Sequence, residues 1–198
     1  MSASRRAKTE EPRSSGRRAS PGSPGSPGSP GSPGSTGSTG RPRLSLSIQL
    51  GERVAELPAS RAQLRRWVSS ALASAEGPTQ MRLTLRFVGE AEGRALNRDY
   101  RGRDYATNVL TFAYDETPRR DGYAGPAEAD IVICLPVLAR EARARRIPLA
   151  HHLAHLVVHG VLHSCGHDHE LDDEARAMEA RETRVLARFA IPDPYRHH

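Results

Sequence analysis

The sequence has 198 residues, a formal net charge of +6 and two cysteines, Cys134 and Cys165. This length suits a single domain with a tail, and two cysteines without a C-x-x-C pattern exclude a disulfide framework. The sequence contains no apolar run long enough to span a membrane and no signal-peptide core. The composition therefore favours a cytoplasmic protein without a membrane partner.

Residues 1–43 differ in composition from the rest of the chain. Five consecutive Ser-Pro-Gly triplets run from Ser20 to Gly34, and large apolar side chains are almost absent, which predicts a disordered tail. The tail carries the whole net charge, because residues 44–198 contain 21 basic and 21 acidic residues. A basic flexible arm can add non-specific contact with nucleic acid, although a merely solubilising extension explains the composition equally well.

Residues 44–198 are predicted to fold as one α+β domain. Alternating apolar residues predict strands at 44–50 and 81–87, and further strands are expected at 109–114 and 130–134. Helical periodicity and start signals predict five helices, which begin near Ser60, Glu90, Pro136, Pro148 and Asp172. Four strands and about five helices in this order predict a mixed four-stranded sheet packed with helices.

Seven of the nine histidines lie in residues 151–169, which read HHLAHLVVHGVLHSCGHDH. His159 and His163 are four residues apart on a predicted helix, so both imidazoles project from one face and can share an ion. Gly166 is placed to end this helix, and the following turn can bring His169 to the same ion. Three imidazoles leave one position open for water or substrate, which is typical of catalytic zinc and predicts metal-assisted hydrolysis.

The neighbouring polar residues have less certain tasks. His155 lies one turn before His159 and is a candidate for orienting a ligand or contacting the substrate. His151 and His152 are expected to form the polar start of the helix. Asp168 either orients a histidine or caps the following turn.

The same histidine spacing occurs in zinc proteases with the pattern H-E-x-x-H-x-x-G-x-x-H. Gly160 stands where those enzymes have the glutamate that acts as general base. A protease is therefore the weaker enzyme hypothesis.

The segment from His159 to His169, HGVLHSCGHDH, resembles the signature H-G-x-L-H-L-x-G-Y-D-H of the YbeY family of ribosomal-RNA-maturation endoribonucleases. Ser164 and His167 replace the usual leucine and tyrosine. Residues 96–112, LNRDYRGRDYATNVLTF, are similar to the family segment L-N-x-x-Y-R-x-x-D-x-P-T-D/N-V-L-S-F, and DIVIC at 130–134 resembles its D-I-x-I strand. The resemblance covers nearly all of the chain from residue 44 onward and implies an α+β fold.

This resemblance implies a metal-dependent endoribonuclease that cuts single-stranded RNA and matures the 3′ end of small-subunit ribosomal RNA. It implies the small ribosomal subunit as partner, and His169 rather than His167 as the third ligand beside His159 and His163. We expect one Zn²⁺ per chain at these histidines.

The resemblance also implies that Arg101 is the functional arginine of the family. Its planar, permanently charged guanidinium group suits the binding of a phosphate. The competing interpretation is a surface arginine paired with Asp99 or Asp104. Asn108 is a further candidate for RNA contact.

Two questions stay open at this point. The run of Arg140, Arg143, Arg145 and Arg146 either extends an RNA-binding surface or forms a solvated helix face. The metal either takes part in catalysis or only holds the C-terminal helices together in a non-catalytic ribosome-assembly factor. Chelation distinguishes these two roles, because removing a structural metal unfolds the domain.

Overall fold

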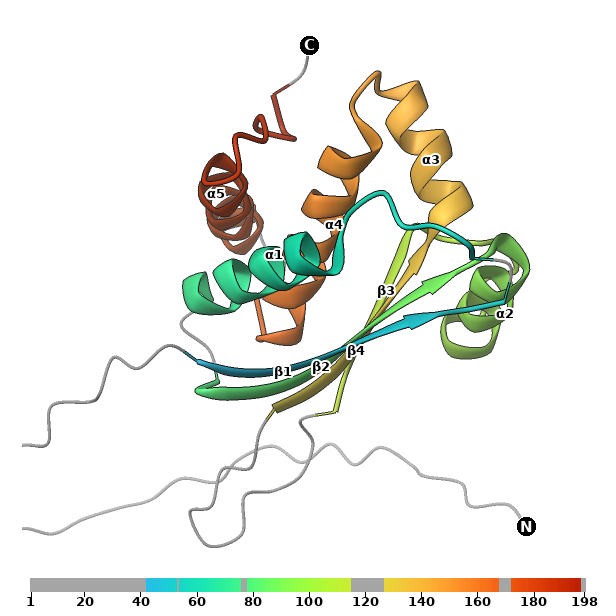
Figure 1. Cartoon of the computed structure of the whole chain (residues 1–198), viewed down its shortest axis with the longest axis horizontal. Helices are drawn as coiled ribbons and strands as arrows, with labels where there is room; N and C mark the ends of the chain where they lie inside the picture. The colour runs from blue at the N-terminus through green and yellow to red at the C-terminus, as the bar shows by residue number, and fades with distance from the viewer. Residues whose placement is uncertain (1–41, 53, 76–77, 115–126, 168–171, 197–198) are drawn as a thin grey trace, which may run out of the picture. The chain divides into compact units, whose positions relative to one another are not determined.

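The computed structural model describes residues 42–52, 54–75, 78–114, 127–167 and 172–196 (Figure 1). In these ranges the chain forms β1 (Arg43–Leu50), α1 (Arg61–Ser74), β2 (Gln80–Val88), α2 (Glu90–Arg101), β3 (Val109–Ala113), β4 (Ala127–Cys134), α3 (Leu135–Ala144), α4 (Leu149–Ser164) and α5 (Asp172–Ala187). The predicted α+β class, with a mixed four-stranded sheet and five helices, is confirmed. Most of the predicted tail lies outside the described residues, so its separation from the domain stays a prediction.

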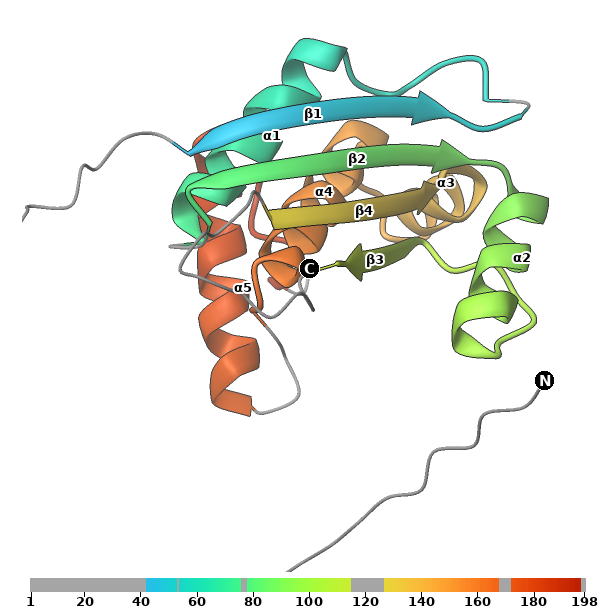
Figure 2. The same cartoon turned by 90° about the horizontal axis from the view of Figure 1, so that it is seen from below.

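The sheet has the strand order β1-β2-β4-β3, which can be followed in Figure 2. β2 pairs in parallel with both β1 and β4, whereas β3 runs antiparallel to β4 at the edge. A parallel pair needs a crossover connection, and α1 supplies it between β1 and β2. Figure 1 shows α1, α3, α4 and α5 on one side of the sheet, with α2 at its end.

Local sequence signals account for the elements that support the core. Ser60 begins α1 with a capping box: its Oγ accepts from the Gln63 backbone N–H at 3.2 Å, and the Gln63 side chain accepts from the Ser60 backbone at 2.9 Å. Alternate residues of β2, from Met81 to Phe87, are buried against the helices. The helix α4 is buried on most of its sides and packs against α1, α3 and α5 as well as the sheet.

Gly160 allows α4 to lie directly against the sheet. A Cβ atom at this position would come within 3.0 Å of the Cδ1 and Cγ2 atoms of Ile131, and within 3.2 Å of the Thr111 hydroxyl. The glutamate that zinc proteases carry after the first histidine therefore has no room here. The packing of α4 adds a steric objection to the protease interpretation.

No helix in the described part of the chain is both long and apolar enough to cross a membrane.

The contact at Gly160 predicts that Gly160→Ala destabilises the protein. Overpacking costs about 1–3 kcal/mol, whereas replacing a helical glycine by alanine recovers about 1 kcal/mol. We expect a net loss of roughly 1 kcal/mol, measured as a lower midpoint of denaturant unfolding.

The double variant Gly160→Ala with Ile131→Val is the matched test. Because valine lacks the Cδ1 atom, the alanine should cost less in this background, and a double-mutant cycle measures that coupling. A single variant more stable than the wild type would show that Ile131 moves aside freely.

Candidate metal centre

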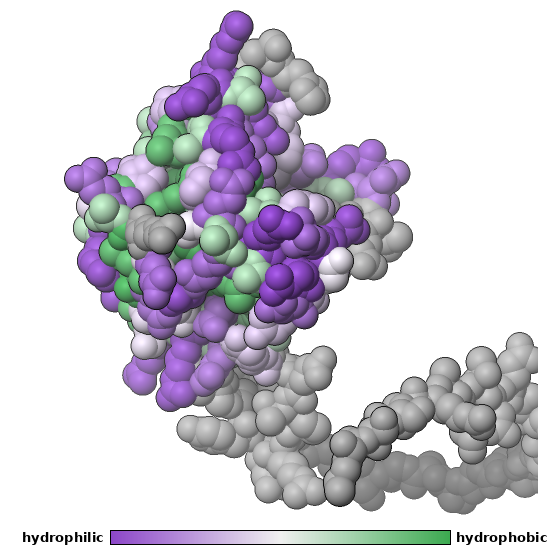
Figure 3. All heavy atoms as spheres, turned by 90° about the vertical axis from the view of Figure 1, so that its right-hand side faces the viewer, coloured by the Kyte–Doolittle hydropathy of each residue, from purple (hydrophilic) through white to green (hydrophobic). Residues whose placement is uncertain are grey.

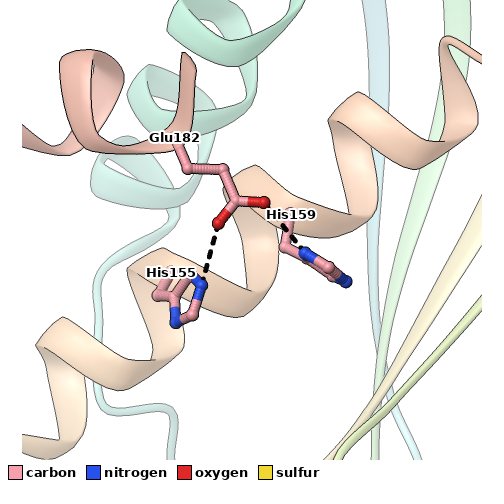
Figure 4. A group of neighbouring side chains, drawn as sticks. All are labelled: His155, His159 and Glu182. Carbon is pink, nitrogen blue, oxygen red and sulfur yellow. Dashed lines mark hydrogen bonds and ion pairs between the residues drawn. The ribbon is translucent and has the colours of Figure 1, made fainter. Parts of the chain in front are cut away.

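A buried carboxylate on α5 joins two histidines of α4. Glu182 is fully buried, and its two oxygens lie 2.9 Å from the Nε2 atom of His155 and 2.9 Å from the Nδ1 atom of His159 (Figure 4). A carboxylate can only accept hydrogen bonds, so both ring nitrogens act as donors. The helices α4 and α5 are thereby linked through one side chain.

Tyr195, in the segment after α5, completes this cluster. Its hydroxyl donates to the Oε2 atom of Glu182 and lies 3.2 Å from the Nε2 atom of His155. Burial raises the pKa of Tyr195, and the nearby Glu182 charge raises it further, so the phenol stays a neutral donor. Burial alone would raise the pKa of Glu182, but the hydrogen bonds from His155 and His159 outweigh it and lower this pKa to about 2. The cluster therefore holds an ionised carboxylate.

The hydrogen bond to Glu182 determines which nitrogen of His159 can bind a metal. With the proton on Nδ1, the Nε2 atom keeps its lone pair, and a carboxylate partner raises the basicity of such a ligand. His163 lies one turn further along α4, with its ring edge-on to His159 and the ring centroids 4.6 Å apart. The structure thus brings together the two histidines that the sequence spacing pairs.

A different group also meets the distance requirement for a metal site. His155, His159 and Glu182 each offer one ligand atom, and these atoms lie within 4.8 Å of one another. Ligands about 2.1 Å from a tetrahedral ion are about 3.4 Å apart, whereas the observed 2.9 Å separations are typical of charge-assisted hydrogen bonds. The geometry favours Glu182 as the carboxylate that orients His159.

His167 is directed toward the end of α1. Its Nε2 atom lies 2.9 Å from the carbonyl oxygen of Ala75, and the Arg181 guanidinium donates to the adjacent carbonyl of Ser74 at 2.6 Å. These contacts satisfy carbonyls that the helix itself leaves unpaired. One ring nitrogen of His167 is thus committed to α1. The predicted third ligand, His169, and its neighbour Asp168 lie outside the described residues.

The expectation of a polar His152 at the start of the helix is wrong for its side chain. His152 does lie in the first turn of α4, but it is only 1% exposed, and its Nε2 atom is 2.8 Å from Glu141. Glu141 on α3 also accepts from the side-chain amide of Asn108, with a closest distance of 3.0 Å. Burial lowers the pKa of His152, so the ring is neutral and donates to Glu141. Asn108 is therefore held within the protein by Glu141.

Arg101 ends α2 and is exposed. Its proposed partners are engaged elsewhere, because Asp99 pairs with Arg98 and Asp104 pairs with Arg94. The Arg101 side chain forms no hydrogen bond or ion pair with any residue that the structure describes, the described histidines included. Figure 3 shows the side of the molecule on which α2 and α3 lie, where hydrophilic side chains cover much of the surface.

A cleft of about 1120 Å³ opens beside the histidines. His152, His155, His159 and Tyr195 line it together with Asn108 and Val109 at the start of β3. The connection between α3 and α4 and the segment after α5 also contribute to its lining. The cleft gives a substrate access to the imidazole cluster.

The sequence analysis missed the two carboxylates that organise these histidines. Glu182 lies four residues after Met178 and three before Val185, on the buried face of α5. A charged residue within an apolar stripe indicates a buried group with a partner. No comparable signal marks Glu141, because its partners Asn108 and His152 come from other elements.

The α+β fold thus places histidines, oriented by buried or half-buried carboxylates, beside an open cleft, and three of these side chains are close enough together to hold an ion. Residues 49–190 match the model of the family described as Endoribonuclease YbeY. The chain belongs to this family, so the resemblance noted in the sequence is confirmed.

Individual relatives agree with this assignment. The Endoribonuclease YbeY of Bordetella pertussis is 57% identical over 157 residues, which cover 77% of this chain and 96% of the relative. The Endoribonuclease YbeY of Aromatoleum aromaticum is 54% identical over 156 residues, covering 77% and 93%. The solution structure of TM1509 from Thermotoga maritima aligns with 77% of this chain and 100% of its own, at 21% identity and a TM-score of 0.48.

The orienting role of Glu182 predicts weaker zinc binding in Glu182→Gln. A glutamine amide donates as well as accepts, so it cannot receive both ring protons, and His159 loses the tautomer that leaves Nε2 free. We expect zinc affinity to fall by about 10–100-fold, measured by competition with a chromophoric chelator.

Glu141→Gln is the matched control, because it alters the other histidine-bound carboxylate and should leave zinc affinity close to that of the wild type. His155→Ala separates the two possible ligand groups. Zinc binding that is abolished by His155→Ala but spared by His163→Ala would show that Glu182 is itself a ligand.

The buried His152 predicts a pH dependence of stability. Its pKa is lower in the folded protein than the value of about 6.5 expected in the unfolded chain. Its stabilising contribution is therefore present above pH 6.5 and is lost as the pH falls toward the folded pKa. In chelator, the free energy of unfolding should fall more steeply from pH 7 to 5 in the wild type than in His152→Gln, which stays neutral. Parallel profiles would contradict a neutral buried His152.

Proposed function

We propose that this protein is a metal-dependent endoribonuclease that cuts single-stranded RNA and matures the 3′ end of small-subunit ribosomal RNA. Membership of the YbeY endoribonuclease family supports the reaction and the class of substrate. The observation that carries the metal dependence is the hydrogen bond between Glu182 and the Nδ1 atom of His159, because it leaves the Nε2 atom of the ring to act as a ligand.

We assign the metal to His159, His163 and His169. The 4.6 Å separation of the first two rings supports their joint use, and the contact of His167 with α1 favours His169 as the third ligand. The donor set suits zinc, since three neutral imidazoles are a known catalytic zinc set. Bound zinc supplies an acidified water and polarises a phosphoryl oxygen. Glu182 keeps the proton of His159 on Nδ1, and the neutral phenol of Tyr195 holds that carboxylate in place.

Arg101 is proposed to bind a phosphate of the RNA. Its guanidinium is exposed and unpaired among the described residues, and its position matches the functional arginine of the family motif. A permanently charged planar fork can hold a phosphate and offset the negative charge that grows on it during hydrolysis. Asn108 is held by Glu141 at the cleft, where it can contact the RNA backbone.

The family setting supports the small ribosomal subunit as partner and the cytoplasm as location, and both stay predictions. The alternative is an assembly factor whose metal is structural. The enzyme is favoured because Glu182 and the apolar core already join α4 to α5, so the helices do not depend on an ion for their contact.

The proposal predicts that the full-length, zinc-loaded protein cuts an end-labelled single-stranded RNA. His163→Ala should reduce the rate by more than about 100-fold, because losing a ligand costs more than losing a group that orients one. Products are resolved on a denaturing gel, and circular dichroism verifies that the variant is folded.

Chelation is the accompanying control. Loss of cleavage with the fold retained agrees with a catalytic metal, whereas unfolding on chelation favours the assembly factor. Undiminished cutting by a folded His163→Ala variant would contradict the metal-centred mechanism.

A further inference from the structure

The cleft beside the histidines has a basic outer part. Arg145 and Arg146, between α3 and α4, line it from one segment. Arg196 lines it from the chain after α5, where its Nε atom lies 3.6 Å from the carboxylate of Asp193, which also lines the cleft. At about 1120 Å³ the cleft exceeds the roughly 300–1,000 Å³ typical of small-molecule pockets. Its size and its arginines suit a segment of a polyanion.

The basic run seen in the sequence divides into two parts in the structure. Arg140 is engaged by the fold, because it donates to Glu90 at 2.9 Å. Arg145 and Arg146 are exposed, and neither forms a hydrogen bond or ion pair through its side chain with any described residue. Arg145 is close enough to His152 for its charge to contribute to the lowered pKa of that ring. These two guanidinium groups are therefore available at the cleft.

Arg146 occupies a backbone position that favours glycine. Its φ angle is 55°, and the N–H group of Ile147 donates to the carbonyl of Ala142 at 3.0 Å, which is the long hydrogen bond of a Schellman motif ending α3. A side chain in this conformation costs about 1 kcal/mol relative to glycine. Glycine would end α3 at lower cost, so what the arginine adds is a charge at the cleft. Backbone strain of this kind is common where a side chain serves a site.

We propose that Arg145 and Arg146 bind backbone phosphates of single-stranded RNA and lead the strand into the cleft toward His155 and His159. This inference rests on the proposed function for the identity of the polymer. Guanidinium groups match phosphate oxygens and stay charged at every physiological pH. The contacts are to the backbone, so they add affinity without reading the base sequence.

Arg145 and Arg146 are proposed to bind the substrate and not to take part in the chemical step, and this role predicts a particular change in the kinetic constants. The arginines contact phosphates in the same way before and during the reaction, so removing them should raise KM and leave kcat unchanged. Loss of a metal ligand has the opposite signature, because it lowers kcat.

The test uses Arg146→Gly and Arg145→Ala/Arg146→Gly in the full-length, zinc-loaded protein. Binding of a fluorescein-labelled single-stranded RNA is followed by anisotropy over a series of KCl concentrations, and a denaturing gel verifies that the RNA is intact. The slope of log K against log [KCl] should become shallower by about 0.7 for each arginine removed, with affinity reduced several-fold. Arg146→Gly should keep or raise the melting temperature, since it relieves the strained backbone.

Arg65→Ala is the matched control, because Arg65 is an exposed arginine of α1 that pairs with no described residue and does not line the cleft. Its RNA affinity and the slope of log K against log [KCl] should match those of the wild type, apart from the small effect of removing one charge that does not contact the RNA. If the two cleft variants bind no more weakly than Arg65→Ala, the proposal is overturned. Binding is read without cleavage, so a failure of the nuclease assignment in the His163→Ala experiment is distinguishable from a failure of this one.

Discussion

A buried negative charge is the constraint on which this structure depends. Taking a carboxylate out of water costs several kcal/mol unless donors surround it, and Glu182 is met by His155, His159 and Tyr195. These donors come from α4 and from the segment after α5, so one side chain fixes the relation of three parts of the chain. Rotating α5 by one residue would leave Glu182 without partners. The same contact that stabilises the packing therefore prepares His159 as a ligand.

A second carboxylate–histidine pair serves a different purpose. Glu141 holds His152 as a neutral ring and also holds Asn108, so α3, α4 and the start of β3 form one rigid side of the cleft. Gly160 allows α4 to pack directly against Ile131 of β4. The more buried part of the cleft lining thus consists of histidines bound to carboxylates, while the exposed guanidinium groups of Arg145 and Arg146 supply positive charge. This separation suits a substrate whose phosphates are held by the arginines while the reaction takes place beside the histidines.

The sequence predicted the elements well because their signals are local. Alternation in β2 and the Ser60 cap of α1 depend on neighbours within a few residues, and the spacing of His159 and His163 needs only a helix. The buried state of His152 could not be predicted, since its partner Glu141 belongs to another helix. Glu182 went unrecognised although it lies between Met178 and Val185 on the buried face of α5, because its partners His155, His159 and Tyr195 come from other parts of the chain. Whether Arg101 forms an ion pair could likewise not be predicted, because it depends on the partners that Asp99 and Asp104 take in the fold.

The most direct test of this account is a crystal structure of the zinc-loaded protein with an anomalous difference map at the zinc edge. The account predicts one ion bound by the Nε2 atom of His159, by His163 and by His169, with Glu182 still hydrogen-bonded to the Nδ1 atom of His159. An ion bound between His155, the Nδ1 atom of His159 and Glu182 would contradict it, because Glu182 would then be a ligand rather than the group that orients one.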